Sequence, residues 1–390
     1  MKGDFSRDTY RPERQYSRVM MQQGRVQIDA DWNEQAAILL GYMRALTRDL
    51  FGAAAGPADE CGFQIVTIEN RASLPAEVAA QVDAALKADK GALDDDDLLI
   101  LPGRYYVGGL PVESTAALRW RAQPGFPFGD ADVDALNKHD WIAYLDVWEE
   151  YVAADQAPDI RETALGGIDT CGRASIRWRV RLLPDASDRA AVEAMTATGS
   201  GRLRARANPS EAADDLCSIA PDARYRGAEN QLYRVEIQSG GAAEAKGTGA
   251  TFKWSRDNGA RTFPIVSGTG NRVTLAHLGH DANDTLVEGD WVEMTDDGAG
   301  GNGLLAQVEA VRRDDLIVEL TLPEGSAALP AYAATEAAAR HALLRRWDHA
   351  GDRAVAGGAL AVVEAQEIEL EDGVRITFEA GGSIAPAITG

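Results

Sequence analysis

Cysteine is scarce in this chain, with only Cys61, Cys171 and Cys217 among 390 residues. The three lie far apart and form no Cys-x-x-Cys pair, which excludes a disulfide framework and a cysteine-rich zinc site. A sparse, odd-numbered set is typical of free thiols in a reducing cytosol. We therefore expect three unpaired, buried cysteines without a chemical role.

Long apolar runs are also missing, because no segment approaches the ~20 residues of a membrane-spanning helix. The first residues are polar and predict no signal peptide. Basic residues are outnumbered by acidic ones, 39 against 61, which gives a net charge of −22. That charge opposes binding to a phosphate backbone and favours solubility or docking to a basic surface. The sequence thus predicts no nucleic-acid partner, no membrane insertion and a cytoplasmic location.

The charge that is present is unevenly distributed. Residues 1–28 contain six basic and three acidic residues, a net charge of +3, so the rest of the chain carries −25. This arm has no periodic apolar face and cannot bury itself, and such segments usually find a partner. The arm is expected to lie either on the chain's own acidic surface or on a neighbouring copy.

A helix is expected directly after the arm. Asp31 is a candidate cap and Glu34 fits a capping box, while Leu39, Tyr42, Met43, Leu46 and Leu50 share one helical stripe. Gly52 and the following AAAGP end it. The stripe packs either on the chain's own β-rich body or on a partner subunit. The predicted interaction residues of arm and helix are Phe5, Arg7, Tyr10, Arg11, Tyr16, Arg18, Met20, Arg25 and Trp32.

The remaining pattern predicts a mainly β chain with a few helices, an α+β class. Residues 98–112 indicate two strands joined at Gly108-Gly109, Trp141–Trp148 is apolar on both faces like a central strand, and Ser175–Leu182 alternates with Trp178 on its apolar face. Short strands between Gly-rich turns favour a small SH3-like or sandwich-like module, followed by a helix and closing strands that pair back onto the first domain. The predicted divisions are 1–52, 53–183, a connecting excursion at 184–227, the small module at 228–325, and 326–390.

No set of residues makes a convincing reactive centre. Asp94–Asp97 lacks the spacing of a calcium loop, and His277 and His280 have no evident third metal ligand. Ser255 has no nearby histidine in sequence to act as its base. Glu149-Glu150 beside Trp148 and Tyr151 is the most sugar-like composition, although strand ends with aromatic residues are common. The sequence therefore predicts no catalytic residues, no cofactor and no metal.

Several segments carry a resemblance. They are MKGDFSRD at 1–8, MQQGRVQIDADWNEQ at 21–35, ALGGIDT at 164–170, YRGAENQLYRVEI at 225–237, FKWSRDNG at 252–259, EGDWVE at 288–293 and LRRWD at 344–348. Together they resemble a family of uncharacterised proteins encoded among components of phage-tail-like contractile injection systems. The resemblance covers nearly the whole chain and supplies no catalytic residues.

Two functions of different classes follow. The first is a structural or adaptor subunit of a tail-like particle, in its baseplate or as a fibre-like part, which docks on other subunits and forms a homo-oligomer, ring or fibre. Such a particle would assemble in the cytoplasm and be released by lysis. The alternative is a tail-associated protein that binds or cleaves surface glycans, which requires two carboxylates in a cleft lined by exposed aromatic residues.

Overall fold

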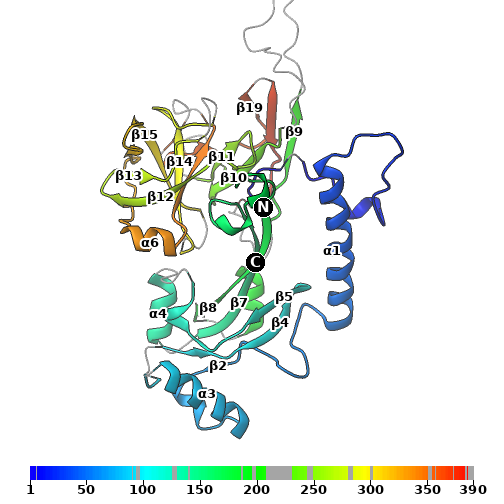
Figure 1. Ribbon diagram of the computed structural model, residues 1–390, viewed down its shortest axis with the longest axis vertical. Coiled ribbons are helices and arrows are strands. Elements are labelled where there is room, and N and C mark those ends of the chain that lie inside the picture. The colour runs from blue at the N-terminus through cyan, green and yellow to red at the C-terminus, as the bar shows by residue number, and fades with distance from the viewer. Residues whose placement is uncertain are drawn as a thin grey trace, which may run out of the picture.

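The fold was analysed in a computed structural model of the chain. The described residues are 1–5, 7–89, 91–93, 97–124, 130–138, 141–185, 188–195, 199–207, 231–243, 249–279, 284–298, 302–349, 354–355, 357–371, 373–382 and 384. The protein is mainly β with few helices, as the sequence predicted, and its strands form several small sheets (Figure 1).

The first half contains most of the helices. Its helices are α1 (Asp29–Phe51), α2 (Ile68–Arg71), α3 (Ala76–Asp89) and α4 (Asp130–Lys138). Its strands are β1 (Ala54–Ala55), β2 (Ile65–Val66), β3 (Leu99–Ile100), β4 (Gly103–Val107), β5 (Leu110–Ser114), β6 (Leu118–Arg119), β7 (Trp141–Val152) and β8 (Arg173–Pro184). Sheets β1-β4-β5 and β2-β3-β6 lie beside the long ribbon β7-β8.

The hairpin β4–β5 confirms the expected turn, since Gly108 and Gly109 both adopt positive φ angles of 59° and 87°. Glycine reaches this region without steric cost, which a two-residue hairpin turn requires. The prediction of a central strand at Trp141–Trp148 was wrong, because β7 belongs to a two-stranded sheet with β8. The ribbon packs against α4 and β5. These contacts explain why β7 is rich in apolar residues although its sheet has only two strands.

The core of this half lies between the β7–β8 ribbon, α4 and the short strands. It contains Leu98, Ile100, Trp120, Ala135, Leu136, Val180 and Leu182. Trp120 is fully buried, and its indole Nε1 donates a 2.8 Å hydrogen bond to the carbonyl oxygen of Val180. The alternation of β8 is only partly as expected, because Trp178 is half-buried while Arg179 on the opposite face is buried. Arg179 stacks over the Trp148 ring at 5.2 Å and donates to the carbonyl of Asp297.

The second set of elements begins within the expected excursion. Its elements are α5 (Arg189–Met195), β9 (Leu203–Ala207), β10 (Arg234–Ser239), β11 (Thr251–Ser255), β12 (Thr262–Thr269), β13 (Arg272–Leu275), β14 (Trp291–Thr295), β15 (Leu304–Arg312), β16 (Ile317–Thr321), α6 (Ala334–Ala339), β17 (Leu343–Trp347), β18 (Leu360–Ala361), β19 (Glu367–Glu371) and β20 (Val374–Phe378). Much of the expected excursion at 184–227 lies outside the described residues.

Strands β12 to β17 close into a barrel in the order β12-β13-β16-β15-β14-β17. Its interior holds one apolar cluster that includes Phe263, Leu275, Leu286, Val292 and Leu344. The closing strand β17 comes from beyond residue 325, so the barrel is longer in sequence than the module expected from the strand pattern. Strand β11, which the same pattern placed in that module, instead pairs with β10 and β18.

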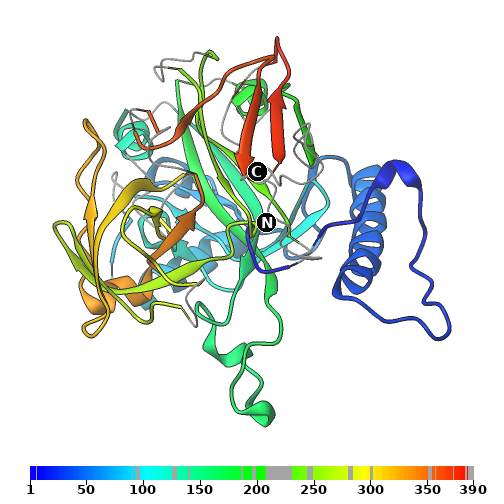
Figure 2. The same ribbon diagram turned by 90° about the horizontal axis from the view of Figure 1, so that it is seen from above.

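The C-terminal strands pair differently from the expectation. Instead of returning to the first domain, β20 pairs with β9 and β19. Sheets β10-β11-β18 and β9-β20-β19 share a core that includes Phe252, Trp254, Leu360 and Phe378. This sheet pair stands beside the barrel, and α1 runs along the opposite side of the molecule from the barrel (Figures 1 and 2).

Candidate functional site

Helix α1 forms for local reasons. Its 23 residues contain no proline and include four alanines and four leucines, which favour helices. The predicted cap at Asp31 was wrong, because the helix begins at Asp29 after Ile28, which makes no side-chain cap. Asp29 and Asp31 instead lie in the first turn, where negative charge suits the helix dipole. Gly52 ends the helix with a φ of 81°.

The inner face of α1 is covered by the chain itself. Ile38 is buried, and Gly41 faces the arm so closely that a Cβ there would lie 2.1 Å from the Tyr10 hydroxyl oxygen. Glu34 accepts a 2.5 Å hydrogen bond from Thr9. Arg44 forms a 2.6 Å ion pair with Glu149 of β7. The helix is therefore fixed from one side by the arm and the ribbon.

The outer face of α1 is apolar and exposed. We call its six central positions the seam, and they are Trp32, Ala36, Leu39, Met43, Leu46 and Leu50. Trp32 is 64% exposed and Leu46 60%. Leu40, Tyr42 and Phe51 are exposed beside the seam. Monomeric proteins rarely expose a contiguous apolar patch of this size, and such patches usually mark interfaces.

The arm is anchored at its beginning by the opposite half of the chain. Gly3 and Asn258 exchange two hydrogen bonds. The backbone N–H of Gly3 donates to the carbonyl oxygen of Asn258 at 3.3 Å, and Asn258 Nδ2 donates to the carbonyl oxygen of Gly3 at 3.0 Å. Gly3 has no room for a side chain, since a Cβ would lie 2.5 Å from the Tyr151 ring. Phe5 packs on the same ring, with centroids 5.8 Å apart.

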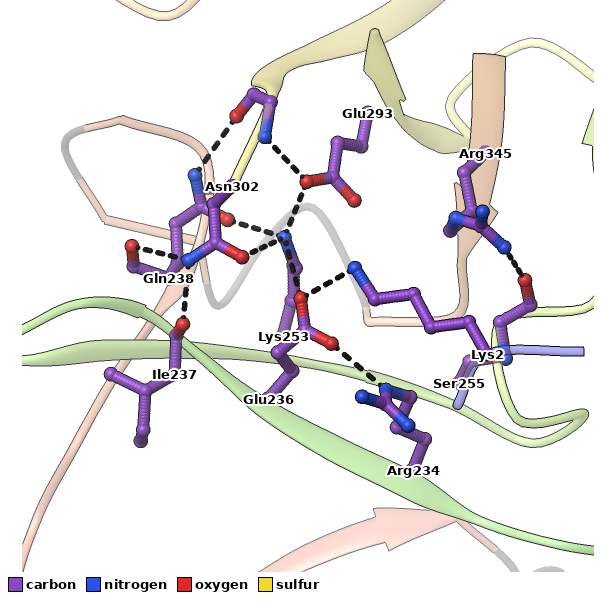
Figure 3. A network of polar contacts seen from close by, with 12 residues as sticks. Lys2, Arg234, Glu236, Ile237, Gln238, Lys253, Ser255, Glu293, Asn302 and Arg345 are labelled. Carbon is purple, nitrogen blue, oxygen red and sulfur yellow. Dashed lines mark hydrogen bonds and ion pairs between the residues drawn. The ribbon is translucent and has the colours of Figure 1, made fainter. Parts of the chain in front are cut away.

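Lys2 enters a cluster of buried charges (Figure 3). Its Nζ lies 2.8 Å from Oε1 of Glu236 on β10. At the centre, the fully buried Lys253 of β11 contacts Glu293 of β14 at 2.8 Å and Glu236 at 3.4 Å. The Lys253 ammonium also lies 4.7 Å from the centroid of the Trp347 ring. We call Lys2, Glu236, Lys253, Glu293 and Trp347 the anchor cluster.

Neutral groups complete the hydrogen bonding of the cluster. Lys253 Nζ donates to Gln238 at 2.6 Å and to Asn302 at 3.2 Å. Glu293 accepts from the backbone N–H of Gly303 at 2.7 Å and from Trp347 Nε1 at 3.0 Å. Buried charges are tolerated when they are paired and hydrogen-bonded in this way. The cluster joins the β10–β11 sheet, the barrel and the arm.

The acids of the cluster have pKa values below their ordinary range. Burial alone would raise the pKa of Glu293, but the charges of Lys253 and Lys2 outweigh it and hold the pKa at about 2, below the ordinary 4.5. Glu236 shows the same balance, with a pKa lowered by Lys2 and Lys253 against the effect of burial. Both groups are therefore ionised at neutral pH.

We expect this ionisation to make stability pH-dependent. A lowered pKa in the folded state stabilises the fold above the ordinary value of 4.5, and this contribution is lost as the pH falls from 4.5 toward 2. A shift of this size corresponds to about 3 kcal/mol. Urea unfolding across that pH range should show a steeper loss for the wild type than for Glu293→Gln, and equal slopes would contradict the assignment.

The structure separates the predicted interaction residues into two groups. Phe5 and Tyr10 are half-buried against the chain itself, on Tyr151 and α1. The others are exposed, namely Arg7, Arg11, Tyr16, Arg18, Met20, Arg25 and Trp32. Phe5 and Tyr10 thus lie on their own chain, and the exposed residues of the later arm and of the helix are available to a partner.

The candidate reactive groups have structural roles. Ser255 is fully buried, and its Oγ accepts from the backbone N–H groups of Asp257 and Gly259 in the turn after β11. His277 lies 3.0 Å from Asp155, and His280 is outside the described residues. Within the described ranges there is no group of three potential metal ligands.

The acidic residues and cysteines that the sequence singled out also have an assigned place in the structure. Asp97 accepts from the backbone N–H groups of Leu98 and Arg121, while residues 94–96 are outside the described part. Glu149 and Glu150 pair with Arg44 and Arg177 at 2.6 and 3.0 Å. Cys61 and Cys171 are free as expected, but they are exposed, so the prediction of buried thiols was wrong for both.

Comparison with known proteins places the chain by family. Residues 1–202 and 189–387 match a family described as "Family of unknown function (DUF6519)". The chain belongs to this family. No curated protein and no solved structure matches it. None of the helices in the described part of this DUF6519 chain has the length and apolar composition to cross a membrane.

Sequence reasoning missed the anchor cluster of this DUF6519 chain, although the signal was present. Five of the segments that carried the resemblance each supply a member or a neighbour of the cluster: the first segment gives Lys2, and the others give Glu236, Lys253, Glu293 and Trp347. A lysine between Phe252 and Trp254, and a glutamate between Val292 and Met294, are charged residues within buried strands. Such residues require a partner of opposite charge.

Proposed function

We propose that this chain is a structural adaptor subunit of a phage-tail-like contractile injection particle. It docks on other subunits through the seam of α1. The main support for this proposal is the exposed apolar outer face of α1. The inner face of the same helix is already fixed by the chain's own arm and β7. The resemblance of seven segments to proteins encoded among such particles indicates the kind of assembly.

The anchor cluster supports the same proposal from another direction. Five of the seven segments that carry the resemblance meet in a buried, paired network that holds the start of the arm. Such a network fixes the relative positions of the segments that it joins. Its acids are buried and paired, so it offers no nucleophile or acid to solvent. The proposed role is accordingly one of position and contact without catalysis, in a particle assembled in the cytoplasm and released by lysis.

Purified particles provide the test. Intact particles from cells that encode this chain should contain the wild-type polypeptide, whereas the double variant Leu39→Glu/Leu46→Glu should be folded but missing. The matched control is Leu165→Glu, because Leu165 at the tip of the β7–β8 loop is 61% exposed, close to the 60% of Leu46. Absence of the wild-type chain from every purified particle would refute the proposal.

A further inference from the structure

The seam of α1 has a strict heptad spacing. Its positions 32, 36, 39, 43, 46 and 50 follow one another at alternating intervals of four and three residues. This is the a/d pattern of a left-handed coiled coil, in which each apolar residue packs between four residues of a facing helix. A surface helix that packs on an irregular body needs only the looser 3.6-residue period. The seam therefore indicates that the missing partner is a helix.

The way α1 is attached to the body matches this geometry. With Leu39 and Leu46 as d positions, Ile38 and Ala45 are c positions, Arg44 is a b position and Gly41 is an f position. These b, c and f positions face outward in a coiled coil. In this chain they face the arm and β7, where Ile38 is buried and Arg44 pairs with Glu149. A bundle around the seam would thus leave β7 on its outside, while Val19 of the arm, whose N–H donates to Gln35 at a g position, borders the seam.

We infer that α1 forms a parallel bundle with α1 of at least two further copies of this chain. This inference rests on the proposed function, since it names the partner of the same face. The e and g positions beside the seam are Asn33, Gln35, Leu40, Tyr42, Thr47 and Asp49. They carry only one charge, so identical helices meet little like-charge repulsion.

The number of helices follows from the width of the apolar face. Leu40 and Tyr42 are exposed at e and g positions, which widens the face beyond the narrow seam of a two-stranded coil. Helices in larger bundles bury these flanking positions as well. A closed ring of three or more identical copies around one axis places all their helices parallel.

The available surface is large enough for a stable assembly. Helix α1 is about 35 Å long at 1.5 Å per residue. The seven large exposed apolar side chains at its a, d, e and g positions offer roughly 800 Å² per copy, if each aromatic ring contributes part of its ~150–250 Å². Standard interfaces bury about 800 Å² per partner. The helix also lies at the periphery of the molecule, where other copies can approach it (Figure 2).

The oligomeric state of the full chain tests the inference. Multi-angle light scattering of wild-type protein at micromolar concentration should give three or more copies, and Leu39→Glu/Leu46→Glu should give a monomer with unchanged circular dichroism. Leu165→Glu should keep the wild-type mass. A monomeric wild type, or an unchanged mass for the double variant, would overturn the bundle.

Cross-linking tests the parallel register. In a background with Cys61→Ser, Cys171→Ser and Cys217→Ser, Leu46→Cys should give covalently linked copies on mild oxidation, because equivalent d positions meet in a parallel bundle. Leu165→Cys, which is equally exposed, should remain unlinked. Absence of linked copies for Leu46→Cys would overturn the parallel arrangement.

The two proposals fail in different ways. A monomeric wild type whose incorporation into particles still depends on the seam would reject the bundle and keep the adaptor function, with another subunit's helix as partner. A trimer or larger oligomer that is absent from all particles would reject the adaptor function and keep the bundle.

Discussion

Replacing Lys253 with methionine is expected to lower the free energy of unfolding by about 3–5 kcal/mol, because Glu293 loses its central partner in a buried site. Methionine keeps the length and flexibility of the side chain, so the packing beside Trp347 changes little. The loss comes from the ammonium group, which Glu293 and Glu236 face at 2.8 and 3.4 Å. Urea unfolding at neutral pH, followed by tryptophan fluorescence, measures it.

Two controls separate this effect from a general loss of charge. Arg312→Met removes the cation of an exposed ion pair with Glu319 on the barrel, and it should cost less than about 1 kcal/mol. The double variant Lys253→Met/Glu293→Gln removes both buried charges and should be more stable than the sum of the single effects predicts. A loss below about 1 kcal/mol for Lys253→Met would contradict the role of the anchor cluster.

Trp120→Ala is expected to cost about 3–5 kcal/mol in the first half of the chain, by removing a fully buried ring and leaving a cavity. The substitution also removes one donor to the Val180 carbonyl, although Gln123 Nε2 still donates to that oxygen at 3.1 Å. Thermal unfolding and urea titration, with circular dichroism as a second probe, measure the change.

Trp178 in the same core supplies the comparison. Its ring is half-buried and contacts Phe63 edge-on, with centroids 4.8 Å apart. Trp178→Ala should therefore cost less than Trp120→Ala. The alternating pattern of β8 alone predicted full burial of Trp178, so a larger loss at position 178 would favour the pattern over the packing that the structure shows.

Local patterns predicted the elements well where one short segment carries the information. The apolar helical stripe of α1, the Gly108-Gly109 turn and most strands of the barrel are of this kind. The alternatives for α1 stayed open, because an apolar stripe looks the same whether it packs on its own body or on another molecule. Only the exposed fraction of residues such as Trp32 and Leu46 separates the two.

Pairings between distant segments could not be predicted. The barrel takes its closing strand from 343–347, and β20 pairs with β9 about 170 positions earlier along the chain, as the register of Val374 with Ala207 shows. No local pattern encodes which edge a strand joins. The pairing in the anchor cluster could not be predicted for the same reason, since Lys253 and Glu293 become neighbours only when β11 packs against the barrel.

The position of Lys2 has a consequence for the order of events during synthesis. Its partners lie at positions 236 and 347, so the first residues of the arm cannot complete their contacts until nearly the whole polypeptide has left the ribosome. At translation rates of about 5–20 residues per second, that delay is roughly 17–70 s. Until then the first residues of the arm lack their contacts with Glu236, Asn258 and Trp347. Contacts of the earliest residues thus form last, and the seating of the arm depends on the later half of the chain being in place.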